Sequence, residues 1–170
     1  MNQDSTDQIT IAQARDIMRP KLEKGTVCLC CGQQTRQYKR IITSAMCQGL
    51  IYIYTDGAEH MTPDGYIHLE NFFKDLIGVP SSIRGDLPKC RFWGLLEPRG
   101  ATREDDNPCD GYYKLTQKGK QFVEGKILVR KAVKLYNNKF YGFHGPEIDI
   151  FGAIKNKFNY SRLMGLKKVA

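Results

Sequence analysis

Apolar side chains recur at helical spacing in three stretches of the first half of the chain. Behind a capping-box pattern that starts at Thr10, this spacing predicts an N-terminal helix that Pro20 kinks or ends. Residues 37–54 carry the longest helical pattern, in which Gly49 either weakens the helix or marks the close approach of a neighbouring element. Residues 69–77 predict a further helix, whose inner face comprises Leu69, Phe72, Phe73 and Leu76.

The next segment predicts a short strand and a short helix. Residues 66–68 are expected to form the strand. Pro80-Ser81-Ser82 predicts a turn, and a short helix follows at about residues 87–93 with Asp86 as its N-cap. Gly94 ends that helix, because a glycine readily adopts the left-handed conformation that closes a helix.

Two apolar segments after this helix are expected to pair as antiparallel strands, at about residues 95–98 and 112–115. Thr116 then caps a further helix. The string Phe-Trp-Gly-Leu-Leu-Glu from Phe92, followed by Gly-Tyr-Tyr-Lys-Leu-Thr across the second strand, resembles the wing of MarR- and PadR-like regulators. The resemblance is best over residues 66–124, and it implies a winged helix-turn-helix, a DNA-binding fold.

The last part of the chain predicts a β-hairpin and a helix. Residues 127–135 and 139–143 are expected to pair around a tight turn at Asn137-Asn138. Pro146 is then expected to open the helix. Its apolar face comprises Ile148, Phe151, Ile154 and Phe158.

Together these elements predict an α+β protein in three parts. An N-terminal helix and cysteine-rich turn (1–35) precede a winged-helix core (36–125), and a basic hairpin with a C-terminal helix follows (126–170). The chain as a whole resembles bacteriophage and prophage proteins. No apolar run approaches the roughly 20 residues of a membrane span, and the N-terminus is too polar for a signal peptide, so we expect a soluble protein in the cytoplasm of the bacterial host.

Charge is distributed unevenly along the chain. Residues 1–125 contain 16 basic and 16 acidic residues, whereas residues 126–170 contain 10 basic and 2 acidic residues, so the second segment carries the whole net charge of +8. Such a basic field attracts phosphate groups, although it also serves solubility alone. The leading hypothesis is therefore a nucleic-acid-binding protein, a phage-type regulator or accessory factor.

The candidate DNA contacts come from the recognition-helix region, the second half of the wing and the first strand of the hairpin. Lys89 and Arg91 are the candidates for base readout, and the other basic residues are candidates for phosphate contacts. A solvated polar surface is the alternative interpretation of all of them. The predicted DNA-binding residues are Arg84, Lys89, Arg91, Lys114, Lys118, Lys120, Arg130 and Lys134.

An acidic loop argues against simple DNA binding. Glu104, Asp105, Asp106 and Asp110 lie at the tip of the predicted wing, where phosphate would repel them. The alternative hypothesis is therefore a protein-binding module, a phage inhibitor that presents this loop to a host defence protein.

Cys28 and Cys31 form a C-x-x-C-G half-motif that suits a structural zinc ion. A second ligand pair is missing from the sequence, so the fold would have to supply it, and a turn with free thiols is the alternative. The possible further ligands are Cys30, Cys47, His60, His68, Cys90, Cys109 and His144.

The sequence gives no indication of an enzyme. It lacks a phosphate-binding loop motif, a dinucleotide-binding glycine motif and an H-E-x-x-H zinc motif. We therefore expect a binding protein rather than a catalyst.

Overall fold

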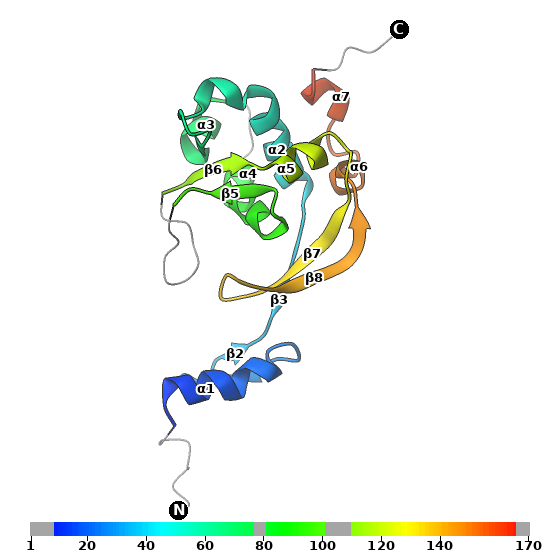
Figure 1. Ribbon diagram of the computed structural model, residues 1–170. Coiled ribbons are helices and arrows are strands. Elements are labelled where there is room, and N and C mark those ends of the chain that lie inside the picture. The colour runs from blue at the N-terminus through cyan, green and yellow to red at the C-terminus, as the bar shows by residue number, and fades with distance from the viewer. Residues whose placement is uncertain (1–8, 77–80, 101–109, 166–170) are drawn as a thin grey trace, which may run out of the picture.

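The computed structural model describes residues 9–76, 81–100 and 110–165, arranged as Figure 1 shows. In these ranges the chain forms seven α-helices, several 3-10 helices and three small antiparallel sheets, so the expected α+β fold is confirmed. None of the helices in the described part is long and apolar enough to cross a membrane.

The N-terminal residues form a small unit at one end of the molecule (Figure 1). Its elements are α1 (Ile11–Met18), the 3-10 helix η2 (Arg19–Lys21), β1 (Thr26–Val27) and β2 (Gln34–Thr35). The predicted capping box is confirmed, because Thr10 and Gln13 each satisfy the other's backbone N–H. Pro20 lies in η2, directly after α1 ends. β1 and β2 pair as a hairpin that encloses the cysteine cluster.

The prediction of a helix over residues 37–54 was wrong in its first third. Residues Tyr38–Ile41 form strand β3, and helix α2 begins only at Ser44 and ends at Asp56. The hydroxyl of Thr43 accepts a hydrogen bond from the N–H of Met46 and fixes the start of α2. The segment before it is extended because β3 pairs with strand β7, a long-range contact that helical periodicity does not reveal.

Gly49 does mark a close approach between helices. A Cβ atom at this position would lie 2.8 Å from Cγ2 of Ile83 and 2.9 Å from Cδ2 of Leu87. The absence of a side chain therefore allows α2 to pack directly against the helical segment that contains Ile83 and Leu87.

The middle of the chain forms a second sheet with helices around it. Its elements are η3 (Gly57–His60), β4 (Ile67–His68), α3 (Leu69–Asp75), α4 (Ser81–Asp86), η4 (Leu87–Trp93), β5 (Leu96–Pro98), β6 (Tyr112–Leu115) and α5 (Gln117–Val123). The strand order is β4-β6-β5. The predicted antiparallel pairing of the last two strands is confirmed, with Leu96 opposite Leu115. The predicted cap is confirmed as well, since the Thr116 hydroxyl accepts from the N–H of Gly119.

The helical region between β4 and β5 differs from the prediction. Ser81 and Ser82 belong to α4 rather than to a turn, and the segment expected as an α-helix is the 3-10 helix η4. Pro88 explains the change, because it has no N–H to donate and disfavours the α conformation of the residue before it. Asp86 makes no side-chain capping bond. Gly94 ends η4 at φ +70° as predicted, and Pro80 lies outside the described residues.

The C-terminal hairpin is confirmed, but the helix after it starts later than predicted. The elements are β7 (Val129–Tyr136), β8 (Lys139–Ile148), α6 (Ile150–Ile154) and α7 (Tyr160–Leu163). Asn137 and Asn138 adopt φ values of +47° and +57° in the tight turn. Pro146 does not open a helix, since it lies within β8 beside a register shift at the edge of the sheet, where a missing N–H is tolerated. Asp149 caps α6 instead.

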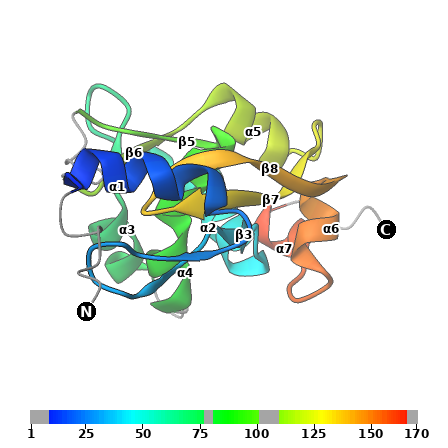
Figure 2. The same cartoon turned by 90° about the horizontal axis from the view of Figure 1, so that it is seen from below.

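One hydrophobic core joins the middle and C-terminal parts of the chain. It contains apolar side chains of α2, η4 and β7, among them the fully buried Leu50, Trp93 and Val133. The Trp93 indole N–H donates to the Arg130 carbonyl, 2.6 Å away, so η4 is tied to the sheet of strand order β3-β7-β8. This core covers one face of that sheet, and the N-terminal unit lies on the other side of it (Figures 1 and 2).

Candidate nucleic-acid interface

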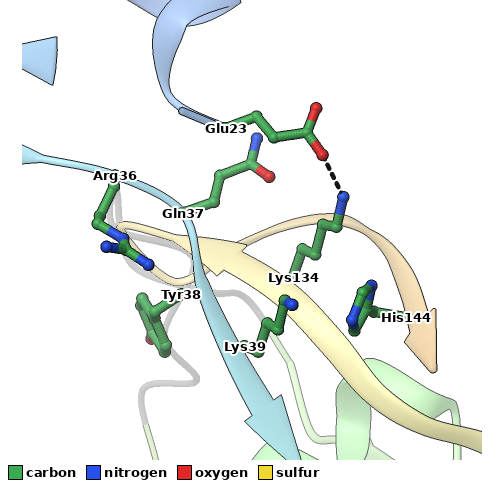
Figure 3. A pocket seen from close by; sticks show the side chains of 7 residues that line it. All are labelled: Glu23, Arg36, Gln37, Tyr38, Lys39, Lys134 and His144. Carbon is green, nitrogen blue, oxygen red and sulfur yellow. Dashed lines mark hydrogen bonds and ion pairs between the residues drawn. The ribbon is translucent and has the colours of Figure 1, made fainter. Parts of the chain in front are cut away.

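A basic pocket lies between the N-terminal unit and the sheet β3-β7-β8. It has a volume of about 650 Å³. Figure 3 shows the side chains that line it: Glu23, Arg36, Gln37, Tyr38, Lys39, Lys134 and His144.

The strand register explains why distant residues meet in this pocket. Lys39 of β3 lies directly opposite Lys134 of β7, and opposite residues of an antiparallel pair share a face. His144 of β8 lies opposite Ala132, two residues before Lys134, and therefore projects from the same face. The N–H of Gln37 donates to the Leu22 carbonyl, which holds the N-terminal unit next to this face.

The lining is net positive. Among the described residues that line the pocket there are three permanent cations, Arg36, Lys39 and Lys134, and one carboxylate, Glu23. Glu23 pairs with Lys134, and this hydrogen bond and charge lower the pKa of the carboxyl, with a further contribution from His144. An anion that enters the pocket would therefore meet an excess of positive charge and a single competing carboxylate.

Of the eight predicted DNA-binding residues, Lys134 is the one that lines this pocket. Arg130 lies on the same strand, where its guanidinium donates to the Gly145 carbonyl at 3.2 Å and lies 3.7 Å from the Glu147 carboxylate. Its side chain is half exposed. Strand β7 thus presents both of its predicted basic residues, each already in contact with an acidic side chain.

The basic residues of the recognition-helix region are engaged within the protein. Lys89 lies 3.3 Å from the Asp86 carboxylate, which also pairs with Arg40. Burial, together with the neighbouring Arg40, lowers the pKa of Lys89. The Arg91 guanidinium donates to the Pro88 carbonyl and lies 4.3 Å from the centre of the Phe92 ring.

Arg84 lines a second pocket of about 560 Å³, beside His68, Glu70 and Asp110. The charges in this pocket are mixed. The structure therefore places Arg84, Lys89 and Arg91 among acidic or carbonyl partners rather than on an open basic surface.

The three lysines after the predicted wing lie on β6 and α5. Lys114 is 3.9 Å from the Glu97 carboxylate and 4.7 Å from the centre of the Tyr66 ring. Lys118 donates to the Trp93 carbonyl at 2.8 Å and so ties α5 to the end of η4. Lys120 is exposed.

The acidic loop falls largely outside the described residues, which include only Asp110 of its four carboxylates. Asp110 accepts from the N–H of Tyr112 and from Nε of Arg99, 2.9 Å away, and these bonds lower the pKa of its carboxyl. Asp110 thus stabilises the base of the loop through contacts within the chain.

Arg36 and Lys39 were not predicted from the sequence as site residues, and His144 was considered only as a possible zinc ligand. Lys39 was missed because residues 37–54 were predicted as one helix, whereas the side chains of a strand at Tyr38–Ile41 alternate between two faces. The sequence did contain a signal for this strand. The cluster of basic residues from Arg36 to Arg40 precedes Thr43, an N-cap residue, and a basic strand that leads into a helix would have this pattern.

The predicted zinc ligands Cys28 and Cys31 lie in the β1–β2 hairpin. The backbone N–H groups of Cys30 and Cys31 donate to the Cys28 sulfur and lower the pKa of its thiol. Gly32 closes the turn at φ +72°, and its N–H donates to the Cys28 carbonyl at 2.9 Å.

No group of three or more potential metal ligands gathers anywhere in the described ranges. Cys47 and Cys90 are buried in the core, where burial raises the pKa of the Cys47 thiol to about 12 and also raises the pKa of the Cys90 thiol, so both are poor thiolate ligands. Cys109 lies outside the described residues.

Comparisons with known proteins found no matching family model, no similar curated protein and no similar solved structure.

Proposed function

We propose that this protein binds nucleic acid and contacts its phosphates through the basic pocket between the N-terminal unit and the sheet β3-β7-β8. The observation that carries the proposal is the convergence of Lys39, Lys134 and His144 from strands β3, β7 and β8 into one concave site, which Arg36 lines from the other side of β3 (Figure 3). A fortuitous excess of surface lysines would not be expected to gather in a pocket with a single carboxylate. Phosphate is the anion that such a cluster of recessed cations suits best.

The arrangement of the middle elements supports a winged-helix core as part of the proposal. Helix α2, strand β4, helix α3, the α4–η4 segment and strands β5 and β6 follow one another in the order of a winged helix. The strand order β4-β6-β5 and the loop between β5 and β6 fit a wing. In this interpretation α4 and η4 occupy the position of the recognition helix.

The proposed mode of binding is phosphate contact with little base readout. Lys89 and Arg91, the candidates for base contacts, already have partners within the protein. Nucleic-acid binding that depends on phosphates is largely independent of sequence. An accessory factor that binds many sequences is therefore a better fit than a regulator with one operator.

The test is a binding assay with the double variant K39Q/K134Q. Removing two of the three permanent cations of the pocket should lower the affinity of the full-length protein for DNA at least tenfold in low salt, because each lost phosphate contact weakens binding. The control is K155Q/K157Q, which removes the same charge from an exposed segment after α6. Equal affinities of the two double variants would contradict the proposal.

A protein-binding function remains the second candidate. It is favoured by Asp86, whose carboxylate pairs with Lys89 and Arg40 and so reduces the positive charge of the recognition region. In that case the acidic loop with Glu104, Asp105 and Asp106 would contact a basic surface of a host protein. A DNA-binding assay distinguishes the two candidate functions, because the protein-binding function requires no affinity for DNA.

We also propose that the β1–β2 hairpin binds a structural zinc ion through Cys28 and Cys31. Backbone N–H groups that donate to a cysteine sulfur stabilise the thiolate, which is the form that binds zinc. The described residues supply this pair only, so the other ligands must come from outside them or from a second molecule.

A further inference from the structure

We infer that the nucleic acid is single-stranded, and that one of its bases stacks on Tyr141 while a neighbouring phosphate lies in the basic pocket. This inference rests on the proposed function and specifies its ligand. It follows from the position of two tyrosines, from the recessed cations of the pocket and from the short helices and paired lysine of the region that α4 and η4 form.

Tyr136 and Tyr141 lie on the same face of the sheet as the pocket. Tyr136 follows Lys134 by two residues along β7, so the two side chains share a face and lie about 7 Å apart along the strand. Strand β8 contains a bulge at this point. Lys134 lies opposite Gly142 and Leu135 lies opposite Phe140, so Tyr141 is the extra residue between them. A bulge redirects a side chain. Here it brings the Tyr141 ring to 6.3 Å from the Tyr136 ring, at an angle of 76°.

The Tyr141 ring is available to a ligand. Its side chain is exposed, whereas Tyr136 is half-buried beneath it and supports it edge to face. An aromatic ring that is held in place next to a cluster of cations is the usual arrangement of proteins that bind single strands, because every base has a face that stacks. Because Tyr136, which contacts Tyr141, follows Lys134 of the pocket by two residues, a base on the ring and a neighbouring phosphate in the pocket would belong to one short stretch of strand.

A duplex fits the same surface poorly. The cations of the pocket are recessed between the N-terminal unit and the sheet, so a rigid double helix would not reach them as a flexible strand does. Readout of the full base code of a duplex places a helix or a two-stranded ribbon in the major groove. The element at that position in the proposed winged helix consists of a six-residue α-helix and a 3-10 helix, with Lys89 paired to Asp86.

The experiment compares the binding of the full-length protein to fluorescently labelled dT20 and to a 20-base-pair duplex in the same buffer. We expect dT20 to bind at least tenfold more tightly. The Y141S variant should lose about fivefold or more of its affinity for dT20, whereas Y141F should retain it, because phenylalanine stacks as well as tyrosine does.

F143S is the matched control on the same strand. Phe143 is also exposed, but it lies opposite Val133 and therefore on the other face of the sheet, so its loss should leave the affinity unchanged. Equal affinity for single strand and duplex, or an unchanged affinity of Y141S, would overturn the inference while leaving the proposed function intact. Failure of the wild-type protein to bind either DNA at low salt would overturn both.

Discussion

At the scale of single residues, the pair of Glu23 and Lys134 is the contact that most affects the proposed site. The Glu23 carboxylate comes from the N-terminal unit and occupies the ammonium group that a phosphate would need (Figure 3). A glutamate is charged at neutral pH with its ordinary pKa, and the hydrogen bond and charge of Lys134 lower this pKa, so the Glu23 carboxylate competes with any incoming anion.

Glu23→Gln should therefore strengthen DNA binding. The change frees the Lys134 ammonium group for one further phosphate contact. The slope of log affinity against log salt should therefore become more negative by up to about 0.7 for a single strand. The measurement is a salt titration of the variant beside wild-type protein. Glu97→Gln is the control, because Glu97 faces Lys114 on the other sheet. If both variants show the wild-type slope, Glu23 does not compete for the site.

At the scale of elements, close packing determines which glycines are replaceable. A Cβ atom on Gly119 in α5 would lie 2.2 Å from the carbonyl oxygen of Leu95, a backbone atom that cannot move away without disturbing β5. Gly85 in α4, by contrast, has open space around it.

Gly119→Ala and Gly85→Ala should thus change stability in opposite directions. The first should lower the free energy of unfolding by about 1–3 kcal/mol, since overpacking outweighs the gain in helix propensity. The second should raise it by about 0.5–1 kcal/mol, because alanine favours a helix more than glycine does. Urea denaturation of both variants checks this. A stabilised Gly119→Ala would contradict the close packing of α5 against the Leu95 carbonyl, just before β5.

The zinc proposal also belongs to a single element, the β1–β2 hairpin. Protein purified without chelator should contain about one zinc per chain by elemental analysis, or about half as much if two molecules share the ion. The double variant C28S/C31S should contain none. Metal-free wild-type protein with the same melting temperature before and after added zinc would show that the hairpin is a turn with free thiols.

Local signals predicted most elements correctly, and long-range pairing explains the errors. Thr10, Gly94 and Thr116 act on residues within one helical turn, so the sequence near them was sufficient to place the caps. The strand at Tyr38–Ile41 depends on pairing with β7, about ninety positions away in the sequence, and its apolar residues also suit a helix. The pocket depends on that strand, which is why Lys134 is the one residue of its lining that was predicted to contact nucleic acid.

At the scale of the whole molecule, the distribution of charge along the sequence differs from its distribution in space. The net charge of +8 falls within residues 126–170, yet two of the three permanent cations of the pocket, Arg36 and Lys39, come from the segment whose charges balance. Folding brings them next to Lys134 because β3 crosses from the N-terminal unit to the edge of β7 (Figures 1 and 2). The site is thus a product of the topology rather than of a basic tail.

The most direct test of nucleic-acid binding through this pocket is a salt titration of wild-type protein with labelled dT20. Because Glu23 occupies Lys134, the two remaining permanent cations of the pocket predict a slope of about −1.4 for log affinity against log salt in wild-type protein, since each phosphate contact contributes about 0.7 for a single strand. A slope close to that value, which becomes shallower in K39Q/K134Q, is the expected result. Absence of binding in low salt, or binding whose salt dependence the double variant leaves unchanged, would contradict the account.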